Sequence, residues 1–137
     1  MKTWLVDTGP LVALLVGDDT QHTWAVEQTK ESPPTVLTCD AVLSEVLFLL
    51  KREDHDTDTL FALMEAGFVR SAFDLQREYR TVRELMRRYQ AQPMSLADAC
   101  LVRMAELHHD TAVWTLDRDF RVYRKNRRQT LSLVTPW

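Results

Sequence analysis

The chain has 137 residues, of which 45% are hydrophobic and 27% are charged, and its formal net charge at pH 7 is −3. This length predicts one domain over residues 1–137, and the composition excludes the disordered and fibrous classes of protein. With only three glycines, the chain contains neither the GxGxxG pattern of dinucleotide sites nor the GxxxxGK[ST] pattern of phosphate-binding loops.

The composition also predicts a cytoplasmic protein that does not bind a membrane. Asp7 and Pro10 interrupt the apolar stretch near the N-terminus, which argues against an export signal. No run approaches the roughly 18 uncharged apolar residues of a membrane span. Cys39 and Cys100 fit no zinc-binding spacing, so we expect them to be reduced thiols that fill core space.

Short apolar segments of strand type alternate with helical segments along the chain. Strands are expected at residues 3–7, 35–38, 68–72, 112–116 and 130–134, and helices at residues 11–16, 21–30, 41–50, 54–66, 75–89 and 95–107. Parallel strands need a crossover connection, and a helix usually provides it. The sequence therefore predicts the α/β class, with a parallel sheet of four to five strands and helices on both faces.

Three carboxylates stand next to apolar residues with no basic partner nearby in the sequence, and a fourth, Asp117, lies in the turn after a buried strand. Asp7 ends one strand, Asp117 follows another, and Asp98 interrupts an apolar helix. Glu45 lies three residues after Val42 in a second apolar helix, so we expect it to point close to the buried side of that helix. A single explanation that covers all four acids is therefore preferable to four separate ones.

Each acid also has a purely structural explanation. Asp7 is placed to cap the helix that follows it, and Asp117 to form a surface turn with Asp119. Ser95 and Asp98 have the spacing of a capping box, in which each side chain accepts a hydrogen bond from the other residue's backbone N–H. Glu45 fits no capping pattern, which makes it the hardest of the four to explain in this way.

Right-handed crossovers would bring these four acids to one end of the sheet. Two carboxylates about 6 Å apart repel by roughly 3 kcal/mol at an effective dielectric constant of 20. Such a cluster must either take up protons or bind divalent cations. Hard oxygen ligands favour Mg²⁺ or Mn²⁺ over Zn²⁺, so a magnesium or manganese site is the expectation.

The C-terminal part of the chain is basic. Residues 120–137 contain no acid and five bases, which are Arg121, Arg124, Lys125, Arg127 and Arg128. A basic segment beside an acidic site suits the binding of a polyanion. Taken alone, the five bases slightly favour a solvated turn over such a binding segment.

With these residues assembled, the chain resembles the PIN-domain family, and most closely the VapC-like toxins of bacterial toxin–antitoxin pairs. The resemblance covers essentially the whole chain. It rests on a helix with Glu45 and on three segments, which are Val6-Asp7-Thr8, Ser95-Leu96-Ala97-Asp98-Ala99 and Thr115-Leu116-Asp117-Arg118-Asp119-Phe120. The last two segments are the specific ones. Gly9 and Pro10 stand where many members have a serine, so the first loop is expected to differ from theirs.

The resemblance implies a three-layer α/β/α sandwich and a metal-dependent ribonuclease. The acids that match the family's are Asp7, Glu45, Asp98 and Asp117, which would bind Mg²⁺ or Mn²⁺, Glu45 either directly or through water. Asp119 matches a more variable position, and the residues that match polar neighbours of the acids are Thr8, Ser95 and Thr115. The resemblance also implies a homodimer and a cognate VapB-like antitoxin.

The hypothesis is therefore the hydrolysis of RNA phosphodiester bonds. Its RNA contacts are expected from Arg118, Arg121, Arg124, Lys125, Arg127 and Arg128. Two alternatives stay open. One is a noncatalytic PIN-like module that binds RNA or protein. The other is a phosphatase of the haloacid dehalogenase type, which needs a second aspartate two residues after the first, where this chain has Gly9.

Overall fold

The computed structural model describes residues 2–137, so Met1 of the expected domain lies outside the described residues. Its central sheet has five strands, all parallel, in the order β3-β2-β1-β4-β7. The strands are β1 (Thr3–Val6), β2 (Val36–Thr38), β3 (Val69–Ser71), β4 (Thr111–Trp114) and β7 (Leu133–Val134). The predicted parallel sheet of four to five strands is confirmed.

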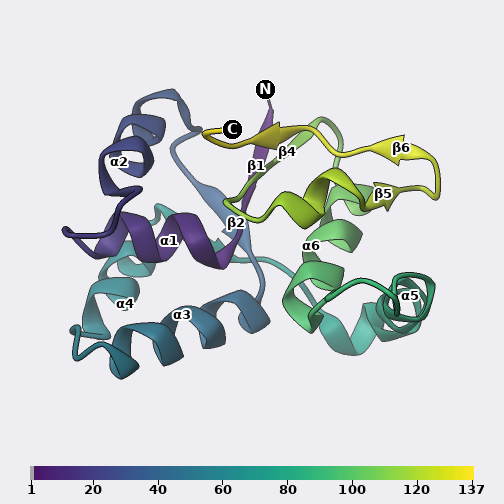
Figure 1. Cartoon of the computed structure of the whole chain (residues 1–137), viewed down its shortest axis with the longest axis horizontal. Coiled ribbons are helices and arrows are strands. Elements are labelled where there is room, and N and C mark those ends of the chain that lie inside the picture. The colour runs from purple at the N-terminus through teal and green to yellow at the C-terminus, as the bar shows by residue number, and fades with distance from the viewer. Residues whose placement is uncertain (1) are drawn as a thin grey trace.

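Helices cover both faces of this sheet. They are α1 (Thr8–Leu15), α2 (His22–Glu31), α3 (Asp40–Arg52), α4 (Asp58–Glu65), α5 (Leu75–Arg88) and α6 (Leu96–Leu107). The connections from β1 through β2 to β3 run toward one edge of the sheet, and those from β3 through β4 to β7 run toward the other. Because parallel crossovers are right-handed, this reversal places α1 to α4 on one face and α5 and α6 on the opposite face (Figure 1). The predicted three-layer arrangement is therefore confirmed.

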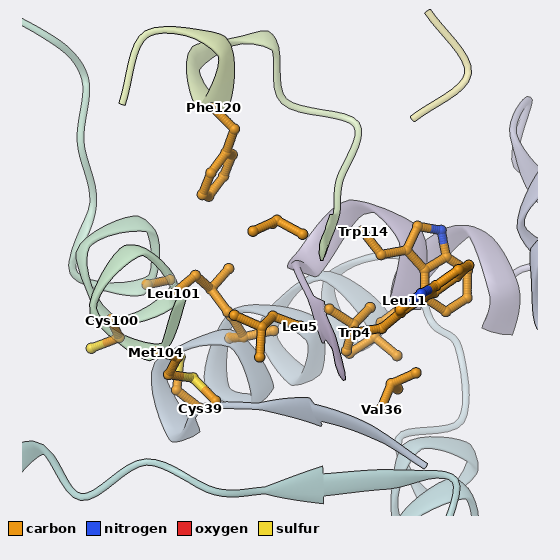
Figure 2. Packing of buried hydrophobic residues seen from close by; sticks show 14 of the residues in the cluster. Trp4, Leu5, Leu11, Val36, Cys39, Cys100, Leu101, Met104, Trp114 and Phe120 are labelled. Carbon is orange, nitrogen blue, oxygen red and sulfur yellow. The ribbon is translucent and has the colours of Figure 1, made fainter. Parts of the chain in front are cut away.

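The central strands are apolar because both of their faces are buried. Leu5 of β1 is fully buried and lies near Leu101 of α6, as Figure 2 shows. Its neighbour Trp4 points to the other face, where its ring meets the ring of Trp114 edge-on at a centroid distance of 5.7 Å. Trp24 of α2 meets Trp114 in the same manner at 6.4 Å. Successive residues of one strand thus hold the two helical layers to a single core.

Several expected elements have different bounds in the structure. The helix expected at residues 54–66 begins only at Asp58, because Asp54 adopts a left-handed backbone with φ of 58° and ends α3. The strand expected at residues 130–134 is divided in two. Its first part joins a small antiparallel hairpin of β5 (Arg124–Lys125) and β6 (Gln129–Thr130), and only β7 reaches the main sheet.

The hairpin was missed because its turn has no glycine. Asn126 and Arg127 both have positive φ values, 50° and 70°. Glycine is the usual sequence signal for this conformation in a hairpin turn, and these two positions lack it. The backbone N–H of Asn126 donates to Glu106 of α6 at 2.6 Å, which holds the hairpin against that helix. The segment before it forms the short 3-10 helix η1 (Arg118–Arg121).

Within residues 2–137, no helix is both long enough and apolar enough to span a membrane.

The buried core predicts a large difference between two leucines of α6. Replacing the fully buried Leu101 by alanine should lower the free energy of unfolding by about 2–5 kcal/mol, because it leaves a cavity under the sheet. Replacing Leu107, which is 48% exposed on the same helix, should cost less than about 1 kcal/mol. Urea unfolding followed by circular dichroism measures both, and equal losses would contradict this description of the core.

Candidate active site

A cleft of about 420 Å³ opens where β1 and β4 end, and all four acids singled out in the sequence line it. They are Asp7, Glu45, Asp98 and Asp117. The carboxyl ends of the strands in an open parallel sheet are the usual position of a ligand site. The four acids therefore lie together in the structure, as the sequence predicts.

Asp7 is the most constrained of the four. Its side chain is 6% exposed, and it accepts hydrogen bonds from the backbone N–H of Thr8 at 2.8 Å and from the hydroxyl of Thr115 at 2.7 Å. The first bond makes Asp7 the N-cap of α1, which therefore begins three residues earlier than expected. Burial raises the pKa of Asp7 to about 7, and the nearby charges of Asp98 and Asp117 act in the same direction.

Asp98 belongs to the capping box that the sequence predicts. The Ser95 hydroxyl accepts from the Asp98 N–H at 3.1 Å, and the Asp98 carboxylate accepts from the Ser95 N–H at 3.3 Å. The Tyr123 hydroxyl donates a third hydrogen bond to this carboxylate, also at 3.1 Å. Burial nevertheless raises the pKa of Asp98, which is 6% exposed. The capping box of α6 and the wall of the cleft therefore share this residue.

Asp117 follows β4 and is tied to Asp7 through Thr115. The Thr115 hydroxyl accepts from the Asp117 N–H at 2.9 Å while it donates to Asp7. Asp117 also accepts from the backbone N–H of Asp119 at 2.8 Å, which is the turn considered for these two residues. Asp119 does not line the cleft, although burial and the charge of Asp117 raise its pKa.

The exposure of Glu45 differs from the predicted one. It was expected close to the buried side of its helix, but the residue is exposed at the rim of the cleft. The reason is that α3 buries Val42, Val46 and Leu50, and Glu45 projects beside that row toward α1. The Thr8 hydroxyl donates to its carboxylate at 2.7 Å.

The four carboxylates are held by neutral donors. Within the described residues 2–137, none of them forms a salt bridge with a lysine, arginine or histidine. Hydroxyl groups and backbone N–H groups orient the acids, so their charges are not cancelled. In the same part of the chain, no three acidic, histidine or cysteine side chains are already gathered as ligands of one ion. The acids share a cleft without forming a closed ligand set.

Gly9 allows the close approach of two segments at this site. A Cβ atom at Gly9 would lie 3.2 Å from the side chain of Leu116, which is tighter than ordinary van der Waals contact. Both residues line the cleft. A side chain at position 9 would therefore require Leu116 to move by a few tenths of an ångström.

The six basic residues singled out in the sequence have different surroundings. Arg118 and Arg121 lie over the ring of Trp137, close to the cleft. The guanidinium of Arg124 donates to three backbone carbonyls, those of residues 121, 122 and 123. Arg127 forms an ion pair with Glu84 at 2.9 Å. Lys125 and Arg128 belong to the hairpin and have no ion pair in the part of the chain that the structure describes.

Two further residues that shape the site were not among those predicted from the sequence. Tyr123 is fully buried, packs edge-on against Phe120 and Tyr89, and donates to Asp98. Its position in a basic segment suggested a solvated turn rather than a buried aromatic cluster. Trp137 was missed as well, since nothing in its neighbouring residues indicates a contact with Arg118. An alternation of aromatic and basic residues was the one available signal.

Comparison with known proteins agrees with this architecture. The chain is similar to the crystal structure of VapC20 from Mycobacterium tuberculosis, a toxin that cleaves the sarcin–ricin loop, with a TM-score of 0.75. The two share 24% sequence identity, and the match covers 88% of this chain and 94% of VapC20. A comparison with curated proteins found no match.

The family assignment comes from the sequence itself. The family description that matches is that of the PIN domain, over residues 4–126. This range includes all four acids of the cleft and both arginines beside it. The chain belongs to the PIN-domain family.

Proposed function

We propose that this protein is a metal-dependent endoribonuclease and the toxin of a VapBC-type toxin–antitoxin pair. One observation supports this more than any other. Four carboxylates of a PIN domain line a single cleft, and no cation within residues 2–137 neutralises them. A fold that needed only stability would not gather these charges, because their mutual repulsion costs free energy.

Mg²⁺ or Mn²⁺ fits the donor set of this cleft. Carboxylate oxygens are hard ligands, and the charges of Asp98 and Asp117 add to burial in raising the pKa of Asp7. We assign the binding of the ion to Asp7, Asp98 and Asp117, with Glu45 binding directly or through water. A divalent ion at this place supplies a water of lowered pKa and stabilises charge on the phosphate.

The polar neighbours of the acids keep those carboxylates in position. Thr115 connects Asp7 to the backbone of Asp117, and Thr8 connects the start of α1 to Glu45. Ser95 fixes the carboxylate of Asp98 relative to the first turn of α6. Asp119 has a secondary role, because its N–H restrains Asp117 from outside the cleft.

We assign the binding of the RNA backbone to the basic segment beside the cleft. Arg118, Arg121, Lys125 and Arg128 have no ion pair in the described part of the chain and are available to phosphates. Arg124 and Arg127 have internal partners and are the weaker candidates. Because VapC20 cleaves the sarcin–ricin loop, a stem-loop of ribosomal RNA is the first substrate to test.

The proposal extends to partners and location. We assign the whole chain to one nuclease domain in the cytoplasm, where its RNA substrates lie and where Cys39 and Cys100 remain free thiols. A VapB-like antitoxin and a second copy of the chain are its expected partners. An apolar groove along α5, lined by Leu75, Tyr79 and Met86, offers a surface for the dimer. A noncatalytic binding module would not need to retain all four acids.

Asp98→Asn tests the nuclease proposal. The variant keeps the size of the side chain and removes its charge, so we expect the rate of RNA cleavage with Mn²⁺ to fall at least about a hundredfold. Gel analysis of a labelled stem-loop RNA measures it. Asp18→Asn, the same change at an exposed position away from the cleft, should cleave at the wild-type rate. Undiminished cleavage by pure Asp98→Asn protein would overturn the proposal.

The raised pKa of Asp7 predicts that metal binding depends on pH. Its folded-state pKa of about 7 exceeds the ordinary value of 3.8, so this group stabilises the metal-free fold at low pH and loses that contribution as the pH rises toward 7. Protons and cations compete for the carboxylate. Mn²⁺ should therefore raise the melting temperature more at pH 8 than at pH 5.5.

Thermal denaturation with and without Mn²⁺ measures this effect. At a hundred times the dissociation constant, a bound ion adds about 2.7 kcal/mol of stability. Asp7→Asn should show a smaller shift that depends less on pH in this range. A wild-type shift of equal size at both pH values would contradict the assignment of Asp7.

Tyr123→Phe tests the role of the buried hydroxyl. Without its hydrogen bond the carboxylate of Asp98 is less well oriented, so we expect kcat for RNA cleavage to fall up to about tenfold with little change in KM. The matched control is Tyr89→Phe. Its hydroxyl accepts from the Arg124 N–H instead, and its loss should lower stability rather than kcat. Equal kcat values for both variants and the wild type would show that Tyr123 has only a packing role.

A further inference from the structure

Two arginines share one aromatic ring beside the acidic cleft. The guanidinium carbon of Arg118 lies 5.0 Å from the ring centroid of Trp137, and that of Arg121 lies 5.3 Å from it. Both distances are within the range of a cation–π interaction. Both arginines are exposed, whereas Trp137 is half-buried.

In the described part of the chain, no carboxylate is paired with either of these two arginines. Neither forms a salt bridge within residues 2–137, although Asp117 and Asp119 are their neighbours in sequence. The other arginines of this region are engaged differently, since Arg124 donates to backbone carbonyls and Arg127 pairs with Glu84. A carboxylate partner would orient a guanidinium and cancel its charge, but an aromatic ring orients it and leaves the charge in place.

The ring of Trp137 is hydrogen-bonded to a residue that lines the cleft. Its Nε1 atom donates a long hydrogen bond to the carbonyl oxygen of Leu116, at 3.4 Å. Leu116 and Asp117 both line the cleft, and Arg118 follows them directly in the chain. The two guanidinium groups are therefore held at the edge of the acidic site by a residue far from the family's motifs.

We propose that Trp137 is a positioning residue that holds Arg118 and Arg121 as a phosphate-binding pair for RNA entering the cleft. This inference rests on the proposed nuclease function. The acids repel the RNA backbone until cations cover them, so a polyanion needs positive charge at the edge of the cleft. The face of the indole ring leaves the outward N–H groups of both arginines free to donate to phosphate oxygens.

The test measures RNA binding separately from cleavage. The binding protein is the Asp98→Asn variant, and the probe is a fluorescent single-stranded RNA oligonucleotide followed by anisotropy with Mg²⁺ present. In this background Trp137→Ala should raise Kd about fivefold, because both arginines lose the ring that orients them. Trp137→Phe keeps an aromatic ring without the indole N–H, and its Kd should stay within about twofold.

The salt dependence of the Kd for RNA separates the effect of lost charge from the effect of lost packing. For single strands, each arginine lost from the phosphate contacts should reduce the slope of log Kd against log salt by about 0.7. Arg121→Gln should show that reduction, and adding Trp137→Ala to it should raise Kd less than Trp137→Ala does alone. The matched control is Arg52→Gln, which removes an arginine that also lies over a ring, that of Phe48, but is paired with Glu53. Its slope should be unchanged.

Each outcome decides the inference. An unchanged Kd for Trp137→Ala would overturn it, and so would equal weakening by Trp137→Ala and Trp137→Phe, because the ring would then not be the cause. In the active protein, Trp137→Ala should raise KM about fivefold and leave kcat within twofold. If the wild type bound RNA through Trp137 but never cleaved it, the nuclease proposal would fail and the positioning role of Trp137 would stand.

Discussion

The structure depends on holding carboxylates close together without neutralising them. Asp7, Asp98 and Asp117 are oriented by hydroxyl and backbone donors, which satisfy their oxygens but add no positive charge. Burial and mutual repulsion then raise the pKa of Asp7 to about 7. A site of this kind attracts whatever positive charge is available, and in a PIN domain the proposed source is a divalent ion.

The same residues build the fold and the cleft. Asp7 ends β1 and caps α1, and Asp98 closes the capping box of α6. Removing either would disturb a helix start as well as the site. The structural role of these acids is therefore compatible with the functional role proposed for them. The helix termini place the carboxylates, and the apolar strands between them keep those termini fixed.

Positive charge is distributed by a similar principle. Arg124 and Arg127 have internal partners and help to fix the hairpin beside α6. Arg118 and Arg121 instead lie over a neutral ring, so their charge remains available at the edge of the cleft. The acids are thus held by neutral donors and these two arginines by a neutral ring, an arrangement that suits a polyanion and a cation together.

The alternation of strands and helices along the chain, the parallel sheet and the convergence of four acids could be predicted, because each follows from local periodicity and from the handedness of crossovers. Four features could be found only in the folded chain: the exposure of Glu45, the buried hydroxyl of Tyr123, the hairpin turn at Asn126 and the contact of Trp137 with two arginines. Those features depend on packing between segments distant in the chain, and no pattern within a short stretch of residues encodes such a contact.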